Sequence, residues 1–570
     1  MQFFGDSKQG RFVLASALLI LSIISAGWRL SADALNDHEC FVSVTAREML
    51  ASGNWILPTY NGQARLQKTP LSYWMVAGLG KVTGKIDEFT ARLPSAIFAV
   101  LSVAAIVYFV NRWLSFRIAV ICGAVWATSE GYIIYSHSAR QDMTMTFFIL
   151  ICFLSFYSAI TEMSRKRQVI YTIIFWGSFG LADLAKGPEP IPLVLVPLFF
   201  YILVFRQWKQ IPKILSVLGV LIFLAITSAW PTAVAYKVNW DIAIWKKEFI
   251  DRFFGEYARG NYPVYFYFII MFKYIIPWIA FLPMALAAPF FRVWAEKQKV
   301  MQFLWFWFVG GLVFLTISGG KRQHYFLPVM PAIIILAGIL LEDLAFARKA
   351  HTARFAVNLL KVHIIAIVTI AVLVLITVFS SGTKWQAYIV KTAVQSFSVW
   401  KTSPQLQAFI IALCATALIA AGIIAMIFAA KKPALGCAII FASIIIFTMI
   451  CSAGIAPLMD TNDCTREFAL KAASVVPQSG RIIARERMSG KFLHYTGRVV
   501  PEIKDENELY RDYQNGDWVA ATEIQAEKLA KGGKFRRVYY NPKEEFYHGE
   551  FTAGAIFHKE SPVIEDAMQK

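Results

Sequence analysis

Charged residues are scarce in this chain: Asp, Glu, Lys and Arg make up 16% of its 570 residues, while 57% are hydrophobic. A soluble domain carries about a quarter charged residues, so the composition excludes an ordinary soluble protein and predicts a polytopic membrane protein. In a soluble protein, the net charge of +19 could suggest nucleic acid. In a membrane protein it instead predicts basic cytoplasmic loops beside anionic headgroups. We therefore expect membrane lipids, and no nucleic acid, among its partners.

Several signatures of soluble enzymes and metalloproteins are also missing. The cysteines and histidines have no spacing typical of a zinc site. The polar C-terminal region has neither a Gly-rich phosphate loop nor a nucleophile elbow. Five of the seven cysteines lie inside apolar runs, where they pack as small residues. The other two, Cys40 and Cys464, are candidates for a disulfide outside the membrane.

Thirteen apolar runs are each near the length needed to cross about 30 Å of hydrocarbon. They occupy residues 12–30, 94–111, 118–135, 143–161, 169–184, 190–205, 212–231, 264–291, 301–318, 326–343, 362–381, 406–430 and 435–455. Alternate connections are short and basic, among them NRWLSFR, TEMSRKR and FRQWKQIPK. The positive-inside rule places these in the cytoplasm with the N-terminus. Because the number of spans is odd, the sequence predicts that the C-terminus lies outside.

The long connections and the C-terminal region fall on the outer side. Beyond residue 459 the chain is polar, and short β-like runs such as RIIARE and FRRVYY alternate with helix-compatible stretches. This pattern predicts a small α/β domain at 460–570, in an accessory role, after a mostly α-helical transmembrane domain at 1–459. The first outer loop, 31–93, is predicted to form a helix ending at a glycine, a turn with a short extended segment, and a second helix at the membrane interface.

Three polar residues stand side by side where this loop begins. The stretch LNDHECFVSVTAREML places Asp37, His38 and Glu39 at the membrane boundary. One interpretation is helix capping: Asn36 is the N-cap and Glu39 closes a capping box three residues later. Asp37 then lies at the favourable end of the helix dipole. The other interpretation is a catalytic carboxylate at a membrane surface, and this stretch alone leaves both open.

Charged residues recur in five outer connections. Because charge near hydrocarbon is costly, this repetition indicates a functional site. Basic side chains suit a phosphate or pyrophosphate headgroup, and a carboxylate such as Asp37 or Asp142 suits proton abstraction from an acceptor. Outside the cytoplasm no ATP or nucleotide sugar is present, so group transfer there needs an activated carrier such as a lipid phosphate. The basic residues concerned are Arg65, Lys68, Arg140, Lys186, Lys321 and Arg322.

The stretch NDHECFVSVTAREMLASGNWILPTYNGQARLQKTPLSYW strongly resembles the first outer loop of the bacterial aminoarabinose-transferase and protein-mannosyltransferase-like families. The resemblance continues through RQDM, LAKGP, EFIDRF and KRQHYFLP and covers residues 30–345. It implies an integral-membrane glycosyltransferase of the C-type fold in a bacterial inner membrane. Such an enzyme moves a sugar from a polyprenyl phosphate to an envelope acceptor, which is lipid A, a glycan or a protein. The resemblance adds Arg252, His324 and Tyr325 to the expected substrate-binding residues.

Two departures from the family pattern bear on the chemistry. Counted back from the REML motif, the family's Asp-Glu pair falls on His38 and Glu39, so a histidine replaces the usual aspartate. Asp37 is the favoured base because Glu39 has a competing role in the capping box, and Glu39 is the alternative. The Glu and His that the family associates with a metal read Gln67 and Phe249 here. We therefore expect no metal at that location and no other cofactor, while a divalent metal elsewhere stays open.

A transporter or flippase for a lipid-linked saccharide is the alternative function, because it would share the many spans and a basic cavity. Transporters often show polar residues near the middle of the bilayer and repeated halves, and the sequence has neither. The structured first outer loop and the one-sided charge favour the glycosyltransferase. The sugar, the acceptor and the oligomeric state are not encoded in any motif that the sequence shows.

Overall fold

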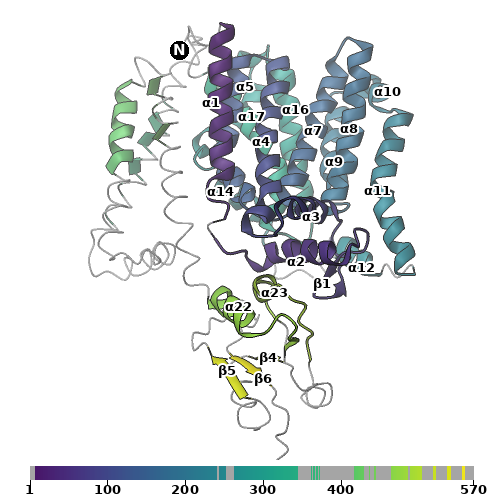
Figure 1. Ribbon diagram of the computed structural model, residues 1–570. Helices are drawn as coiled ribbons and strands as arrows, with labels where there is room; N and C mark the ends of the chain where they lie inside the picture. Colours follow the sequence, from purple (N-terminus) through teal and green to yellow (C-terminus); the bar gives the residue numbers. More distant parts are fainter. Residues whose placement is uncertain are drawn as a thin grey trace, which may run out of the picture. The chain divides into compact units, whose positions relative to one another are not determined.

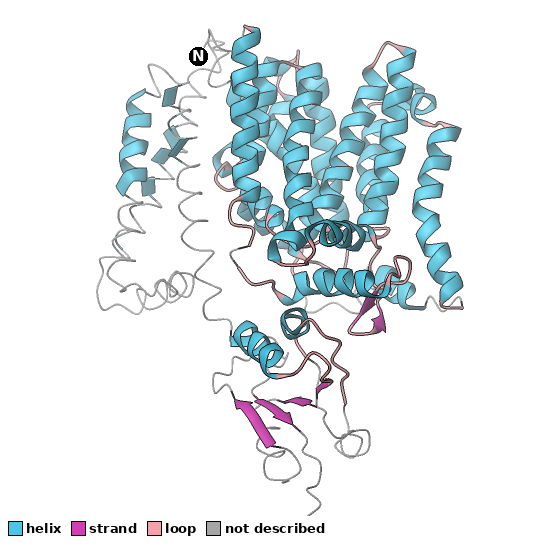
Figure 2. Ribbon diagram, in the orientation of Figure 1, coloured by secondary structure: helices cyan, strands magenta, loops and turns pink. Residues whose placement is uncertain are grey.

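A computed structural model of the chain consists mainly of helices (Figure 1, Figure 2). It describes residues 7–31, 33–239, 243–251, 254, 262–343, 416–428, 464–484, 488–503, 518–521, 536–540 and 555–558, with isolated positions in 358–376 and 435–443. The chain divides into two compact units. The helical unit consists of Met1–Leu30, Leu66–Ser72 and Arg92–Met459, and the loop–tail unit of Ser31–Arg65, Tyr73–Ala91 and Asp460–Lys570. The division predicted from the sequence, 1–459 and 460–570, stays a prediction.

Seven helices among the described residues are long and apolar enough to cross a membrane, or eight if one bent pair counts as a span. They are α1 (Lys8–Gly27), α4 (Glu88–Trp113), α7 (Asp142–Thr161), α8 (Arg165–Lys186), α11 (Val217–Lys237), α16 (Gln298–Ile317) and η6 with α17 (Gln323–Glu342). The bent pair is α5 (Phe116–Ala127) with α6 (Glu130–Ser136), at 61°. The predicted runs 362–381, 406–430 and 435–455 fall largely outside the described residues, so the total of thirteen spans stays a prediction.

The predicted span 264–291 is wrong as a single helix. It breaks into α14 (Phe266–Ile275), η3 (Ile279–Phe281), α15 (Leu282–Ala287) and η4 (Ala288–Phe290). Three prolines, Pro277, Pro283 and Pro289, fall within this run. Proline has no backbone N–H, so each one removes a hydrogen bond from the helical ladder and favours a kink or a break there. Apolar α9 (Pro190–Val204) is a shorter helix of the same unit.

The helices of this unit differ in what they expose. α7 and α17 are almost entirely buried, whereas α1 and α11 expose most of their apolar surface, including Leu218, Leu221 and Leu224. Inside the unit, Phe153 of α7 stacks on Trp307 of α16 with ring centroids 4.2 Å apart. The exposed apolar surface is expected of helices that face lipid rather than water.

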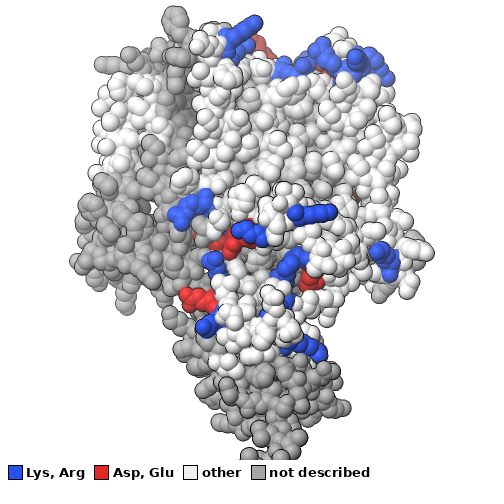
Figure 3. Space-filling view, in the orientation of Figure 1, with Lys and Arg blue, Asp and Glu red and all other residues white. Residues whose placement is uncertain are grey.

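The short basic connections come together at one end of the helical unit. There, Arg112 pairs with Glu162 at 3.0 Å, and Lys297 contacts Glu342 at 3.3 Å and Asp343 at 3.1 Å. Figure 3 shows Lys and Arg gathered at this end, next to a broad band without charge. The arrangement agrees with a bilayer flanked by basic loops. Which side of the membrane this end faces stays a prediction.

Most of the first outer loop lies in the loop–tail unit, and its helices, turn and short strands form where the sequence predicts. Helix α2 (Asp37–Ser52) begins with the complete capping box of Asn36 and Glu39, so the capping interpretation is confirmed. It ends at Gly53, whose φ of 68° places it in the left-handed region that favours glycine. A two-residue turn, Asn61 and Gly62, joins β1 (Thr59–Tyr60) to β2 (Gln63–Ala64). Helix α3 (Leu71–Thr83) is the second predicted helix.

Buried Glu48 ties the turn to α2. Its carboxylate accepts the Thr59 hydroxyl at 2.7 Å and the backbone N–H groups of Asn61 at 2.7 Å and Gly62 at 3.1 Å. Asn61 and Gly62 both have positive φ, as a tight Asn-Gly hairpin requires. Glu48, the acidic residue of the REML motif, therefore has a structural role: it holds this turn against α2.

The C-terminal part of the loop–tail unit contains α22 (Cys464–Val475), α23 (Gly490–Thr496) and a four-stranded sheet. Its strand order is β3 (Ile482–Ala484), β4 (Trp518–Ala521), β6 (Ala555–His558) and β5 (Arg536–Tyr540). β3 lies in the predicted run RIIARE and β5 in the predicted run FRRVYY. Whether this region is a separate domain stays a prediction. Cys40 is buried and is not in a disulfide, so the disulfide considered with Cys464 is not formed in the structure.

Candidate functional site

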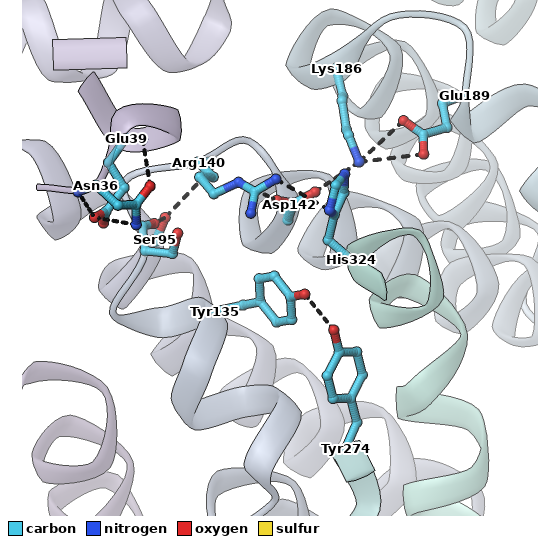
Figure 4. Close-up of polar contacts among 11 residues, drawn as sticks. Asn36, Glu39, Ser95, Tyr135, Arg140, Asp142, Lys186, Glu189, Tyr274 and His324 are labelled. Atoms are coloured by element: carbon cyan, nitrogen blue, oxygen red, sulfur yellow. Dashed lines mark hydrogen bonds and ion pairs between the residues drawn. The ribbon is translucent and has the colours of Figure 1, made fainter. Parts of the chain in front are cut away.

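A group of ionised side chains is buried at the end of the helical unit where α7 begins and α8 ends (Figure 4). Asp142 begins α7 and Lys186 ends α8, and their carboxylate and ammonium groups lie 2.7 Å apart, with side chains only 2% and 3% exposed. Glu189, just before α9, contacts the same ammonium at 3.2 Å. Lys186 therefore bridges two carboxylates, which is the pairing that ionised groups need when they leave water.

Arg140 and His324 extend this charge cluster. The Arg140 guanidinium lies 3.3 Å from the Asp142 carboxylate and 3.2 Å from Nδ1 of His324. A guanidinium can only donate hydrogen bonds, so Nδ1 accepts and carries no proton in this contact. The Lys186 ammonium also lies 4.6 Å from the centre of the Tyr325 ring, within the range of a cation–π contact.

Two of the connections that bring these residues together have a defined backbone geometry. Ser95 of α4 donates to the backbone oxygens of Ser138 at 2.6 Å and Arg140 at 3.3 Å, which fixes the turn before α7. The chain then leaves α8 through Gly187, at φ 95°, and Pro190 starts α9, a position where its missing N–H is harmless. The cluster is thus held by backbone geometry as well as by ion pairs.

The charges of the cluster cancel: Arg140 and Lys186 contribute two positive charges, and Asp142 and Glu189 two negative ones. The Asp142 carboxylate is taken up by two cations, so it is poorly suited to accept a proton from an acceptor. The Lys186 ammonium is likewise occupied. This geometry favours a supporting role for both residues over the base and phosphate-binding roles expected from the sequence.

Lys321 and Arg322 lie just before η6 and have no acidic partner among the described residues. The Lys321 ammonium donates to the Ser318 backbone oxygen at 3.1 Å. The Arg322 backbone N–H donates to the Tyr267 hydroxyl at 3.2 Å, and its half-buried guanidinium makes no hydrogen bond to the described part of the chain. These two residues supply positive charge beside a cluster that is itself neutral.

The segment that carries Lys68 packs on the end of α8. The Thr69 hydroxyl donates to the backbone oxygen of Asp183 at 3.3 Å, one turn before Lys186. The Trp245 indole donates to the backbone oxygen of Leu66 at 2.9 Å. Lys68, between these two contacts, therefore belongs to the neighbourhood of the α8 C-terminus.

One expected donor contact and part of the family's metal position lie outside the described residues. Arg252 lies outside the described residues, as does the side chain of Phe249. The side-chain oxygen of Gln67 is buried and has no hydrogen-bond partner among the described residues. A metal was not expected at the Gln67 position, and that expectation stays a prediction.

The remaining predicted residues lie in the loop–tail unit. Glu39 is buried, and its carboxylate accepts both the backbone N–H and the side-chain amide of Asn36, at 3.0 and 2.8 Å. Asp37 is half-buried, and one carboxylate oxygen accepts the Lys491 backbone N–H at 3.2 Å. The Arg65 guanidinium lies 4.2 Å from the Phe41 ring centre and donates to the Tyr73 hydroxyl. Of the two candidate bases, Asp37 is less buried than Glu39.

Sequence reasoning missed two features of the cluster region. Glu189 follows Lys186 by three residues in LAKGPEP, a spacing that could have indicated the ion pair. Tyr135 and Tyr274 share a hydrogen bond between their hydroxyl groups (Figure 4). These two tyrosines are 139 residues apart, so no local pattern points to that contact.

Apolar spanning helices with exposed hydrocarbon-like surfaces, and a buried charge cluster at one end of them, define a multi-pass membrane protein with a polar site at the membrane boundary. Comparison with known proteins narrows the class of membrane protein that this chain resembles. A family model described as dolichyl-phosphate-mannose-protein mannosyltransferase matches residues 67–231.

Two relatives share the name undecaprenyl phosphate-alpha-4-amino-4-deoxy-L-arabinose arabinosyl transferase. The one from Pseudomonas aeruginosa (strain UCBPP-PA14) is 27% identical over 297 residues, which are 51% of this chain and only 53% of that protein. The one from Proteus mirabilis, numbered 2, is 26% identical over 408 residues, which are 69% of this chain and 70% of that protein.

A solved structure resembles the whole chain. The crystal structure of ArnT from Cupriavidus metallidurans bound to undecaprenyl phosphate has a TM-score of 0.76 and 18% identity, covering 97% of this chain and 98% of that one. The family resemblance predicted from the first outer loop is therefore confirmed. The chain is similar to the aminoarabinose-transferase and protein-mannosyltransferase group, and its fold is the C-type fold of the solved structure.

Proposed function

We propose that this protein is a glycosyltransferase of the inner membrane that moves a sugar from a polyprenyl-phosphate carrier to an acceptor in the cell envelope. The observation that carries the proposal is the unbalanced positive charge of Lys321 and Arg322 beside the neutral cluster. Such cations suit the phosphate of a lipid carrier. The likeness to a structure with bound undecaprenyl phosphate supports this donor class.

The acceptor is lipid A, a glycan or a protein. The relatives named as arabinosyl transferases support a pentose, and the family model named for mannosyl transfer supports a hexose, so both donor classes belong in the assay. A transporter or flippase of the same carrier would move the intact lipid and release no transferred sugar.

The transfer needs a base and a stabilised leaving group. Asp37 is the proposed base for the acceptor hydroxyl or amine, with Glu39 as the alternative. As the acceptor oxygen or nitrogen bonds to the sugar C1, the bond from C1 to the phosphate oxygen breaks with inversion. The proton passes to the carboxylate, and the electron pair leaves on the phosphate. Lys68, Lys321 and Arg322 are the proposed groups that stabilise this charge, with Arg252, His324 and Tyr325 contacting the donor.

Lys68→Ala tests the phosphate assignment in neutral detergent, where anionic lipid is absent. We expect donor turnover to fall about tenfold, the effect of losing one charge-assisted hydrogen bond, with the protein still folded. The measurement is release of a radiolabelled sugar from its polyprenyl phosphate to an envelope extract. Lys81→Ala, an exposed lysine of α3, is the matched control.

Activity that survives Lys68→Ala in neutral detergent, and falls only in anionic liposomes, would identify Lys68 as a membrane anchor instead. Failure of the unmodified protein to transfer sugar from either donor class, together with movement of the intact carrier, would favour the transporter.

The proposed orientation places the basic end of the helical unit in the cytoplasm. In a cysteine-free background, we expect Arg165→Cys and Lys209→Cys to be shielded from a membrane-impermeant thiol reagent in spheroplasts. We expect Gln63→Cys and Lys471→Cys, exposed residues of the loop–tail unit, to react. Labelling of Lys209→Cys without labelling of Lys471→Cys would reverse the orientation.

A further inference from the structure

Helix α23 of the C-terminal region packs along the start of α2, within the loop–tail unit. The backbone N–H of Lys491 donates to the Asp37 carboxylate at 3.2 Å. Gly490 approaches α2 so closely that a Cβ there would lie 2.8 Å from the Cβ of Cys40 and 3.2 Å from the backbone oxygen of Asp37. Only glycine allows the two helices to approach at this point.

Two further contacts continue along the same face of α2. The Ser43 hydroxyl shares a hydrogen bond with Nδ1 of His494 at 3.0 Å. The Arg47 guanidinium donates to the His494 backbone oxygen at 2.9 Å. The contacting residues of α2 are Asp37, Cys40, Ser43 and Arg47, a spacing of three and four that places them on one side of a helix.

Tyr495 holds the residues just before Asp37. Its hydroxyl accepts the Leu35 backbone N–H at 3.0 Å and donates to the Glu88 carboxylate at 2.8 Å. Arg466 also contacts Glu88, at 3.4 Å. Burial raises the pKa of Tyr495 well above its usual range, and the nearby Glu88 raises it further, so the hydroxyl keeps the proton that it donates. The segment before α2 is therefore fixed by the same short helix.

The second oxygen of Asp37 makes no hydrogen bond to the described residues. A carboxylate has two oxygens that accept hydrogen bonds. The backbone N–H of Lys491 holds Oδ1 and so limits rotation of the carboxylate, while no hydrogen bond to the described residues occupies Oδ2. Catalytic groups need this kind of support, because a misplacement of about 1 Å can cost roughly a hundredfold in rate.

We propose that α23 is a positioning element for sugar transfer, with the Lys491 N–H and the Tyr495 hydroxyl as the positioning groups that set Asp37 for its role as base. The inference rests on the proposed function. It gives the C-terminal region a direct part in the reaction, beyond the accessory role predicted from its sequence.

Lys491→Pro tests the proposal, because it removes the backbone N–H together with the side chain, and proline is tolerated in the first turn of a helix. Lys491→Ala keeps that N–H and is the matched control. We expect Lys491→Pro to lower kcat about tenfold with the KM for the donor unchanged, and Lys491→Ala to behave as the unmodified protein. Amide hydrogen exchange across residues 35–41 should rise in the proline variant alone.

A double-mutant cycle separates positioning from general support. In an Asp37→Ala background, Lys491→Pro should cause no further loss of kcat, since its effect acts through Asp37. Tyr495→Phe is a second test that does not depend on the folding of the proline variant. It preserves the ring, removes only the hydroxyl, and should lower kcat by a smaller factor.

Equal kcat values for Lys491→Pro and Lys491→Ala would overturn the positioning role. So would a further tenfold loss in the Asp37→Ala background, or unchanged kcat in Tyr495→Phe. These results differ from failure of the proposed function, in which the unmodified protein itself transfers no sugar. In that case the positioning role falls with the function, whatever the exchange data show.

Discussion

Asp37→Asn is expected to lower sugar transfer by about 10²-fold or more, the usual scale for loss of a general base. Asparagine has nearly the same shape, and its amide oxygen can still accept the Lys491 N–H that Asp37 accepts at 3.2 Å. It cannot take a proton from the acceptor. Expression, thermal stability and binding of the polyprenyl-phosphate donor should therefore stay near the unmodified level while kcat falls.

Glu39→Gln is the matched control for this prediction. Glutamine also closes a capping box, so the start of α2 should survive, and activity should stay within a few-fold of the unmodified protein. A large loss in Glu39→Gln with Asp37→Asn silent would move the base to Glu39. Normal turnover in both variants would leave the motif with capping and packing roles only.

The local features of the first outer loop could be predicted from the sequence because short-range rules determine them. The capping box joins Asn36 to Glu39 three residues later, and the helix stop at Gly53 needs only a left-handed residue. The apolar runs that form spanning helices among the described residues could be predicted in the same way, since length and hydropathy depend on neighbouring residues alone. The run 264–291 was misread because hydropathy outweighed its three prolines.

Contacts between distant residues could not be predicted. Asp142 and Lys186 are 44 residues apart, and each alone resembled a site residue: one a free carboxylate, the other an open cation. The structure pairs them, which changes the expected role of both. Lys491 and Asp37 are 454 residues apart, and a backbone N–H donor leaves no trace in the sequence.

Replacing Lys186 should therefore act on stability before it acts on chemistry. Lys186→Met leaves the carboxylates of Asp142 and Glu189 without the ammonium that lies 2.7 and 3.2 Å from them. Removing one partner from a buried ion pair costs about 3–5 kcal/mol, and methionine fills a similar volume. We expect the free energy of unfolding to fall by that amount, visible as a large drop in the thermal midpoint in detergent, with transfer lost alongside the fold.

Two comparisons make this prediction specific. Lys297→Met removes another lysine that bridges two carboxylates, but its side chain is 19% exposed against 3% for Lys186, so water can replace more of the lost contacts and the loss should be smaller. Asp142→Asn combined with Lys186→Met should recover part of the stability, because one buried charge is removed with its partner. A stable Lys186→Met protein that binds donor weakly would instead support the role of Lys186 in binding the donor phosphate. The charge cluster would then be an open binding site, with Asp142 and Glu189 as partners that the donor displaces.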